Sequence, residues 1–185
     1  LVPLGLEGDL QKWGVEPAKI TRFDWWQELK TDNALLAFTP TQHFSGRGLS
    51  DRNTTLWGSW VVKVAGRSLY FSGDSGYFDG FKTIGEKYGP FDLTLIETGA
   101  YNKDWPDIHM WPEESVQAHI DLKGGTLLPI HNATFDLSFH AWYDPLERVS
   151  KAAEARGVRL STPVTGEVFT VQQAAFTEKW WRDYK

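Results

Sequence analysis

The chain has 185 residues, of which 41% are hydrophobic and 23% are charged, a length and balance that suit one globular domain with a core of its own. Its 24 acidic and 19 basic residues give a net charge of −5 with the signs interspersed, so we expect no nucleic-acid partner, because phosphate backbones require a basic surface. Cysteine is absent, which excludes disulfides and thiolate ligands and leaves histidine and carboxylate groups to hold any metal.

The apolar runs of the sequence are short. None approaches the roughly 20 residues that a helix needs to cross a bilayer, and the chain does not open on the pattern of a secretory signal. We therefore expect no transmembrane segment and a cytoplasmic location, with attachment to the periphery of a membrane left open.

Short apolar runs alternate with amphipathic stretches, which is typical of a layered α/β domain. In chain order the sequence predicts a helix over 6–13, strands over 20–26 and 34–39 joined by a turn at 31–33, and hairpin strands over 56–64 and 68–72. Further along it predicts a helix over 78–88, a strand over 91–97, a helix over 112–122, a strand over 127–130, a helix over 145–156, and strands over 158–160 and 167–171. Glycine and proline punctuate these elements in the positions expected of helix ends and turns.

Three side chains that can bind a metal come shortly after predicted strands, namely His43, Asp74 and His131. Ligands of layered α/β folds bind beyond the carboxyl ends of strands, so strands that run the same way would bring these three to one edge of the sheet. Two imidazoles and a carboxylate suit Zn²⁺ or a similar divalent ion. Each residue also has a structural explanation, since Asp74 stands in a Ser-Gly-Asp-Ser-Gly turn and a histidine after a strand is usually hydrogen-bonded.

Several segments around these residues have characteristic amino-acid sequences. They are 39–43 (TPTQH), 56–60 (LWGSW), 71–77 (FSGDSGY), 89–93 (GPFDL), 99–101 (GAY), His109 with 112–114 (PEE), and 129–131 (PIH) with 134–135 (TF). In order and spacing, over nearly the whole chain, they resemble the N-acylphosphatidylethanolamine phospholipase D group of metallo-β-lactamase-fold hydrolases.

This resemblance implies a zinc-dependent hydrolase of phosphodiester or ester bonds with two Zn²⁺ per complete site, other divalent ions remaining an alternative. His43 would bind one ion, His131 the other, and Asp74 would bridge them and take part in catalysis. A metal-bridged hydroxide would be the nucleophile. The substrate would be a small-molecule or lipid ester or phosphodiester.

The other candidate residues are assigned less directly. The resemblance places His109 close to the metals, where it could bind substrate or protonate a leaving group as a catalytic residue, and packing against Trp111 is the structural alternative. We expect His119 to belong to the core and His140 to be structural. Asp136 could orient a ligand imidazole through its other nitrogen.

The sequence departs from the family in one respect. Members carry a His-x-His-x-Asp-His motif in their N-terminal half, and the five histidines of this chain do not form it. We therefore expect the motif to precede Leu1 and residues 1–185 to form a single partial domain, the C-terminal half of an αββα sandwich with a mixed β-sheet and flanking helices. Such a chain would be inactive alone, and its exposed apolar surface would pair with the missing half or form a homo-oligomer.

The chain is rich in aromatic residues, with ten Trp, eleven Phe and six Tyr. They predict either large core side chains or an apolar groove, membrane-facing or dimer surface. A second hypothesis for function follows from the latter, a catalytically silent module that binds a lipid or a protein. The zinc content of the purified chain distinguishes the two hypotheses.

Overall fold

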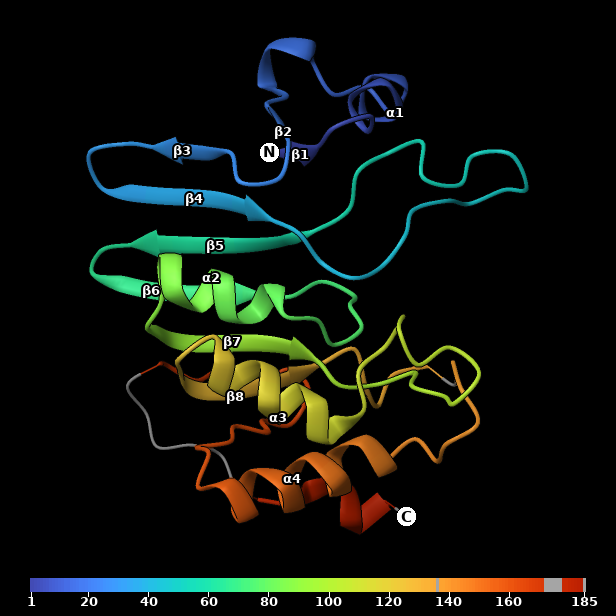
Figure 1. The fold of residues 1–185 in the computed structure, drawn as a ribbon, viewed down its shortest axis with the longest axis vertical. Coiled ribbons are helices and arrows are strands. Elements are labelled where there is room, and N and C mark those ends of the chain that lie inside the picture. Colours follow the sequence, from blue (N-terminus) through green and yellow to red (C-terminus); the bar gives the residue numbers. More distant parts are fainter. Residues whose placement is uncertain (136, 172–177, 185) are drawn as a thin grey trace.

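The computed structural model describes residues 1–135, 137–171 and 178–184, and its centre is a six-stranded mixed sheet with helices (Figure 1). In spatial order the strands are β3 (Glu28–Lys30), β4 (Ala34–Thr39), β5 (Ser59–Val64), β6 (Arg67–Phe71), β7 (Phe91–Glu97) and β8 (Gly124–Ile130). The helices are α1 (Glu7–Lys12), α2 (Gly80–Tyr88), α3 (Pro112–Asp121) and α4 (Asp144–Arg156), with 3₁₀ turns at Pro17–Lys19 and Trp180–Tyr184. A short parallel pair, β1 (Val2–Pro3) and β2 (Arg22–Phe23), lies beside the sheet. The predicted α/β class with a mixed sheet is confirmed.

The strand directions decide where the loops meet. Neighbours from β3 to β6 are antiparallel, whereas β6, β7 and β8 are parallel. Since β5 is antiparallel to both β4 and β6, the strands β4, β6, β7 and β8 all point the same way, as Figure 1 shows. Their carboxyl ends therefore lie along one edge of the sheet.

One face of the sheet carries the core. Cross-strand partners share a face, and the row Ala37, Val61, Tyr70, Thr94 and Leu127 is buried completely. The helices α2 and α3 lie over this face, and α4 packs on α3 (Figure 1). We call this side the covered face.

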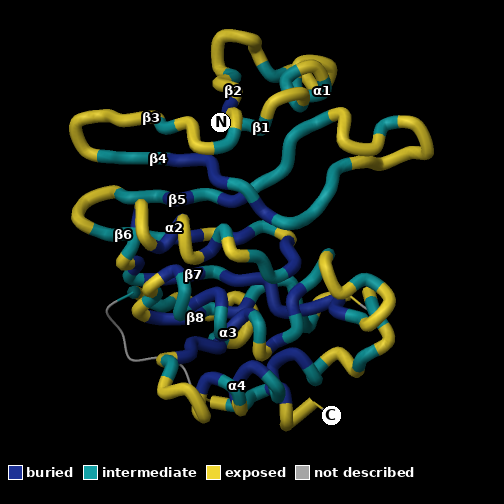
Figure 2. Tube along the Cα trace, in the orientation of Figure 1, coloured by how far each residue is buried: buried dark blue, intermediate teal, exposed yellow. Residues whose placement is uncertain are grey.

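The opposite face is also apolar, but several of its residues are less buried. Figure 2 shows residues of intermediate burial along β4, β5 and β6. Its neighbouring partners Leu36, Val62 and Leu69 are partly exposed, and Val64 and Phe71 keep 42% and 43% of their surface accessible. We call these five residues the open face. An apolar patch of this kind on a sheet favours an interaction with a further layer of structure.

Three predicted strands differ from the structure. The segment 20–26 contributes only the two residues of β2, and the strand that precedes the turn at 31–33 is β3. The segment 158–160 is reduced to one bridge between Leu127 and Leu160, and 167–171 forms no strand. Alternating apolar residues predict a strand only if a partner lies alongside, and in 167–171 Val168 instead remains 89% exposed. Asp136 lies outside the described residues.

No helix in the described part of the chain combines the length and apolar character needed to cross a bilayer.

Candidate metal centre

Loops at the carboxyl ends of strands that point the same way carry the candidate ligands. His43 follows β4, Asp74 follows β6 and His131 directly follows β8. The backbone of His131 is left-handed, with φ of 61°, and so is that of Gly73 before Asp74, also 61°. A non-glycine residue in this conformation is uncommon and is held by its surroundings, as residues at functional sites often are.

The structure brings all the predicted site residues together. The rings of His43 and His109 have centroids 5.4 Å apart, and those of His109 and His131 are stacked at 5.2 Å. Nε2 of His131 lies 3.6 Å from Oδ1 of Asp74. The prediction that His43, Asp74 and His131 meet at one edge therefore agrees with the geometry, while their roles as ligands stay predictions.

The donor atoms fit a divalent metal. Nδ1 of His43 lies 2.9 Å from the carbonyl oxygen of Phe44, so it carries the proton and Nε2 keeps its lone pair. That Nε2 is buried and has no hydrogen-bond partner among the described residues. Two donors on a tetrahedral zinc ion, each about 2.1 Å from it, lie roughly 3.4 Å apart, which is close to the separation of His131 and Asp74.

Sequence reasoning missed Glu97. This side chain is fully buried at the end of β7, and Glu97, His109 and His131 offer donor atoms within 4.8 Å of one another, close enough for a possible metal site. Oε1 of Glu97 is 2.8 Å from Nδ1 of His109 and 3.9 Å from Nδ1 of His131. The sequence does contain a pattern that could have identified Glu97, because this residue ends an apolar strand just as His131 follows one.

Burial shifts the pKa values of Glu97 and His109 in opposite directions. It raises the pKa of the Glu97 carboxyl well above its usual value, against the opposing effects of the Ser75 backbone N–H and of His131. Burial also lowers the pKa of His109. His109 is therefore neutral near pH 7, which is the form that a metal or a proton can approach.

The remaining histidines lie elsewhere. His119 is buried, with Nδ1 2.6 Å from Oγ1 of Thr94, as the core prediction requires. His140 stacks on Tyr101 at 4.2 Å. The ring of Trp111 also packs on Tyr101, whereas His109 is held by Glu97.

The aromatic residues divide between core and surface. Trp181 is fully buried, whereas Phe135 and Phe139 are 77% and 85% exposed. Phe135 lines, together with Leu137 and His131, a cavity of about 340 Å³ beside the histidines. Both interpretations of the aromatic content therefore apply, to different residues.

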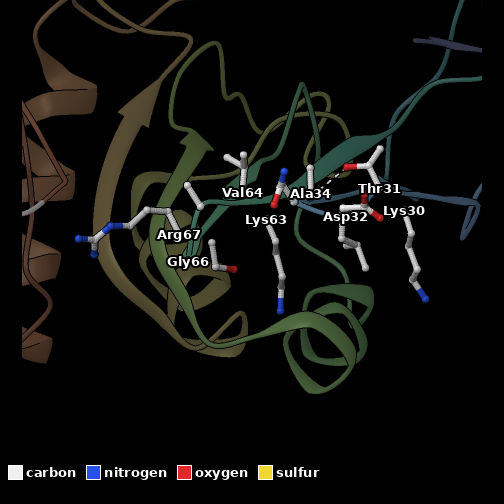
Figure 3. A pocket seen from close by; sticks show the side chains of 12 residues that line it. Lys30, Thr31, Asp32, Ala34, Lys63, Val64, Gly66 and Arg67 are labelled. Carbon is white, nitrogen blue, oxygen red and sulfur yellow. Dashed lines mark hydrogen bonds between the residues drawn. The ribbon is translucent and has the colours of Figure 1, made fainter.

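A second cavity, of about 540 Å³, lies at the opposite edge of the sheet (Figure 3). The turns before β4 and β6 form it, and Lys30 and Lys63 extend from it in the same direction while Arg67 points away. Lys30 pairs with Glu28 at 2.7 Å and Arg67 with Asp92 at 3.6 Å. None of its lining residues is a histidine, and the candidate ligands His43, Asp74 and His131 lie at the other edge.

Comparisons with known proteins identify the family of this chain. Residues 1–132 match the family described as the beta-lactamase superfamily domain. An uncharacterized protein of Mycobacterium tuberculosis is 45% identical over 98% of this chain and 50% of its own length. The N-acyl-phosphatidylethanolamine-hydrolyzing phospholipase D 1 of Caenorhabditis elegans is 34% identical over 84% of this chain and 47% of its own length.

A solved structure shares the fold. Igni18, described as a novel metallo hydrolase from Ignicoccus hospitalis, superposes with a TM-score of 0.65 at 22% identity, over 91% of this chain and 69% of its own. The chain spans about half the length of the curated relatives it matches. By its sequence match and its fold, the chain belongs to the beta-lactamase superfamily and has the fold of the metallo-β-lactamase-type metal-dependent hydrolases.

Proposed function

We propose that this chain supplies part of a dinuclear zinc centre in a hydrolase of phosphodiester or ester bonds. The observation that carries the proposal is the 3.6 Å separation of His131 Nε2 and Asp74 Oδ1, a distance suited to two ligands of one ion. The buried, unpartnered Nε2 of His43 adds a third donor. When bound, the ions would make water nucleophilic near neutral pH and would stabilise negative charge on the ester oxygens.

The protein residues have distinct roles in this proposal. His43 and His131 would hold the ions through their imidazole nitrogens, and Asp74 would hold them through its carboxylate. His109 is neutral near pH 7, so it would first accept a proton and then deliver it to the leaving group. Asp74 keeps 45% of its side chain exposed, which leaves a route for substrate.

The substrate class is supported by the surroundings of the site and by the relatives. The C. elegans relative is named for the hydrolysis of N-acyl-phosphatidylethanolamine. Beside His131, the cavity lined by Phe135 and Leu137 offers an apolar surface to the acyl part of a lipid-like ester. We propose such a substrate for the complete enzyme.

A second layer would complete the domain. Three ligands shared between two ions leave both with too few donors, and the open face lacks a covering layer among the described residues. The matched relatives are about twice as long as this chain. We propose that residues 1–185 act as one half of an αββα sandwich, with the other ligands supplied by a second half, and that the chain alone is inactive.

Metal content tests the site. The purified chain is dialysed against zinc and analysed by mass spectrometry, alone and with the N-terminal half of the M. tuberculosis relative fused ahead of Leu1. We expect the fusion to retain zinc, Asp74→Ala and His131→Ala to lose it, and the exposed control Asp104→Ala to retain it. A metal-free fusion would contradict the proposal and favour a catalytically silent binding module.

Activity tests the reaction. Bis(4-nitrophenyl) phosphate reports phosphodiester hydrolysis and 4-nitrophenyl acetate reports ester hydrolysis. We expect the fusion to cleave at least one of them, and Asp74→Ala to lose at least 100-fold in rate, about 2.7 kcal/mol of transition-state stabilisation. A zinc-loaded fusion that cleaves neither would overturn the assigned bond class.

A further inference from the structure

We propose that Glu97 is a positioning residue that holds His109 with its proton on Nδ1 and its Nε2 lone pair free for the centre. This inference rests on the proposed function for its purpose, but the contact between Glu97 and His109 stands on geometry alone. No family segment discussed above includes Glu97.

The position of the Glu97 carboxylate is determined by two loops at once, the one that follows β6 and the one that follows β7. Oε2 lies 3.2 Å from the backbone nitrogen of Ser75 and 3.4 Å from that of Met110. Both nitrogens are donors, so this oxygen accepts two hydrogen bonds and cannot rotate away. Oε1 is then left facing the ring of His109.

The distance to His109 distinguishes a hydrogen bond from shared metal binding. Nδ1 of His109 and Oε1 of Glu97 are 2.8 Å apart, within the usual range of a charge-assisted hydrogen bond. Two ligands of one tetrahedral zinc ion would lie farther apart, at roughly 3.4 Å. The carboxylate therefore contacts the ring as an acceptor and leaves the other nitrogen, Nε2, for the centre.

The location of the proton follows from the number of protons that Glu97 and His109 share. Once Glu97 is ionised the pair carries a single proton, which lies between the ring and the carboxylate, because among the described residues Oε1 has no other hydrogen-bond donor and the anion would repel a bare Nδ1. A histidine with Nδ1 bound to a carboxylate and Nε2 free is the arrangement that orients imidazoles in metal sites. The same hydrogen bond prevents rotation of the His109 ring, which stands between those of His43 and His131.

The variant Glu97→Gln reverses this arrangement. The backbone N–H groups of Ser75 and Met110 select the amide oxygen, which turns the amide nitrogen toward His109. Nδ1 must then accept a hydrogen bond, so the proton moves to Nε2 and blocks the lone pair. A matched control is Thr98→Val, a near-isosteric change at the adjacent buried residue, whose hydroxyl bonds, among the described residues, to the Ile96 carbonyl oxygen alone.

Nitrogen NMR of the ¹⁵N-histidine-labelled chain, in the absence of metal and at pH 8, reads the tautomer directly. We expect His109 to carry its proton on Nδ1 in the wild type and in Thr98→Val, and on Nε2 in Glu97→Gln. A wild-type His109 protonated on Nε2, or a Glu97→Gln variant with an unchanged tautomer, would overturn the proposal. Circular dichroism checks that each variant is folded, and the wild-type spectrum decides the matter even if Glu97→Gln is not.

The rate of hydrolysis separates this inference from the proposed function. In the zinc-binding fusion we expect Glu97→Gln to lower the rate on the nitrophenyl substrates at least about 10-fold, because a proton on Nε2 prevents His109 from accepting another one there, with the zinc content and the rate of Thr98→Val unchanged. A fusion that binds no zinc contradicts the proposed function while the tautomer still tests Glu97. An active, zinc-loaded fusion whose rate does not respond to Glu97→Gln contradicts the role of Glu97 and leaves the function standing.

Discussion

On the covered face of the sheet the central side chains are buried under α2 and α3, whereas on the open face Leu36, Val62 and Leu69 remain partly exposed. Both faces are built from the same kinds of residue on the same strands. Composition therefore does not distinguish them, and only the helices do. Apolar residues on both faces of a strand are typical of a sheet that is buried on both sides, so the open face is suited to packing against a further layer of structure.

The largest expected difference between the faces is in stability. Phe81 of α2 is fully buried on the covered face, and Phe81→Ala should cost about 3–5 kcal/mol of unfolding free energy through lost burial and a cavity. Phe71→Ala on the open face, where the ring is already 43% exposed, should cost about 1 kcal/mol or less. Urea unfolding followed by tryptophan fluorescence measures both. Equal losses would show that the open face is covered in solution.

The second expected effect is a pH dependence of the free energy of unfolding, which arises from a histidine on the covered side of the sheet. Burial, with a smaller contribution from Arg159, lowers the pKa of His119 from 6.5 to about 4. Between these values the unfolded chain binds more protons than the folded one, so the free energy of unfolding falls as the pH drops from 6.5 towards 4. The loss is on the order of 3 kcal/mol.

The variant His119→Gln isolates this contribution. Its amide can still reach Oγ1 of Thr94 but does not titrate, so the difference between variant and wild type should shrink as the pH is lowered through that window. Urea unfolding at a series of pH values from 7 to 4.5 gives the difference directly. Parallel curves for the two proteins would exclude His119 as the source.

The third prediction concerns self-association through the open face. It involves the smallest expected change in stability and is the most direct test of the open face. Exposed apolar patches promote association, so Leu69→Ser with Phe71→Ser should reduce concentration-dependent self-association of the chain at a cost of about 1 kcal/mol or less per site. Sedimentation velocity at several concentrations measures it. Val168→Ser, at a residue 89% exposed outside the open face, is the control and should leave association unchanged. Equal behaviour of the two variants would remove the open face from consideration as an interface.

Much of the fold could be predicted because its signals are local. Residues 34–39 and 91–97 match β4 and β7 throughout, and Ala65 and Gly66 adopt the left-handed backbone that a tight hairpin requires. The strand predicted at 167–171 was wrong because pairing depends on a partner that local sequence does not specify. For the same reason β3 was missed, since its three residues are defined by their pairing with β4.

Some residues of the candidate site could likewise be predicted from local sequence, whereas Glu97 was missed. His43, Asp74 and His131 could be proposed because each follows an apolar strand, and because a chain without cysteine must hold a metal through histidine and carboxylate groups. Glu97 could not be chosen with the same ease, because a glutamate at a strand end is ordinary until its burial and its contact with His109 are known.

By itself, the sequence determined the α/β class, most helices and strands, and the types of residue that can bind a metal, because these depend on periodicity, turn chemistry and composition. Only the tertiary structure decided that β4, β6, β7 and β8 point the same way, that Glu97 lies against His109, and that the five residues of the open face stay partly exposed. These features depend on which strands pair and which helices pack, and both are set by contacts between residues far apart in the chain.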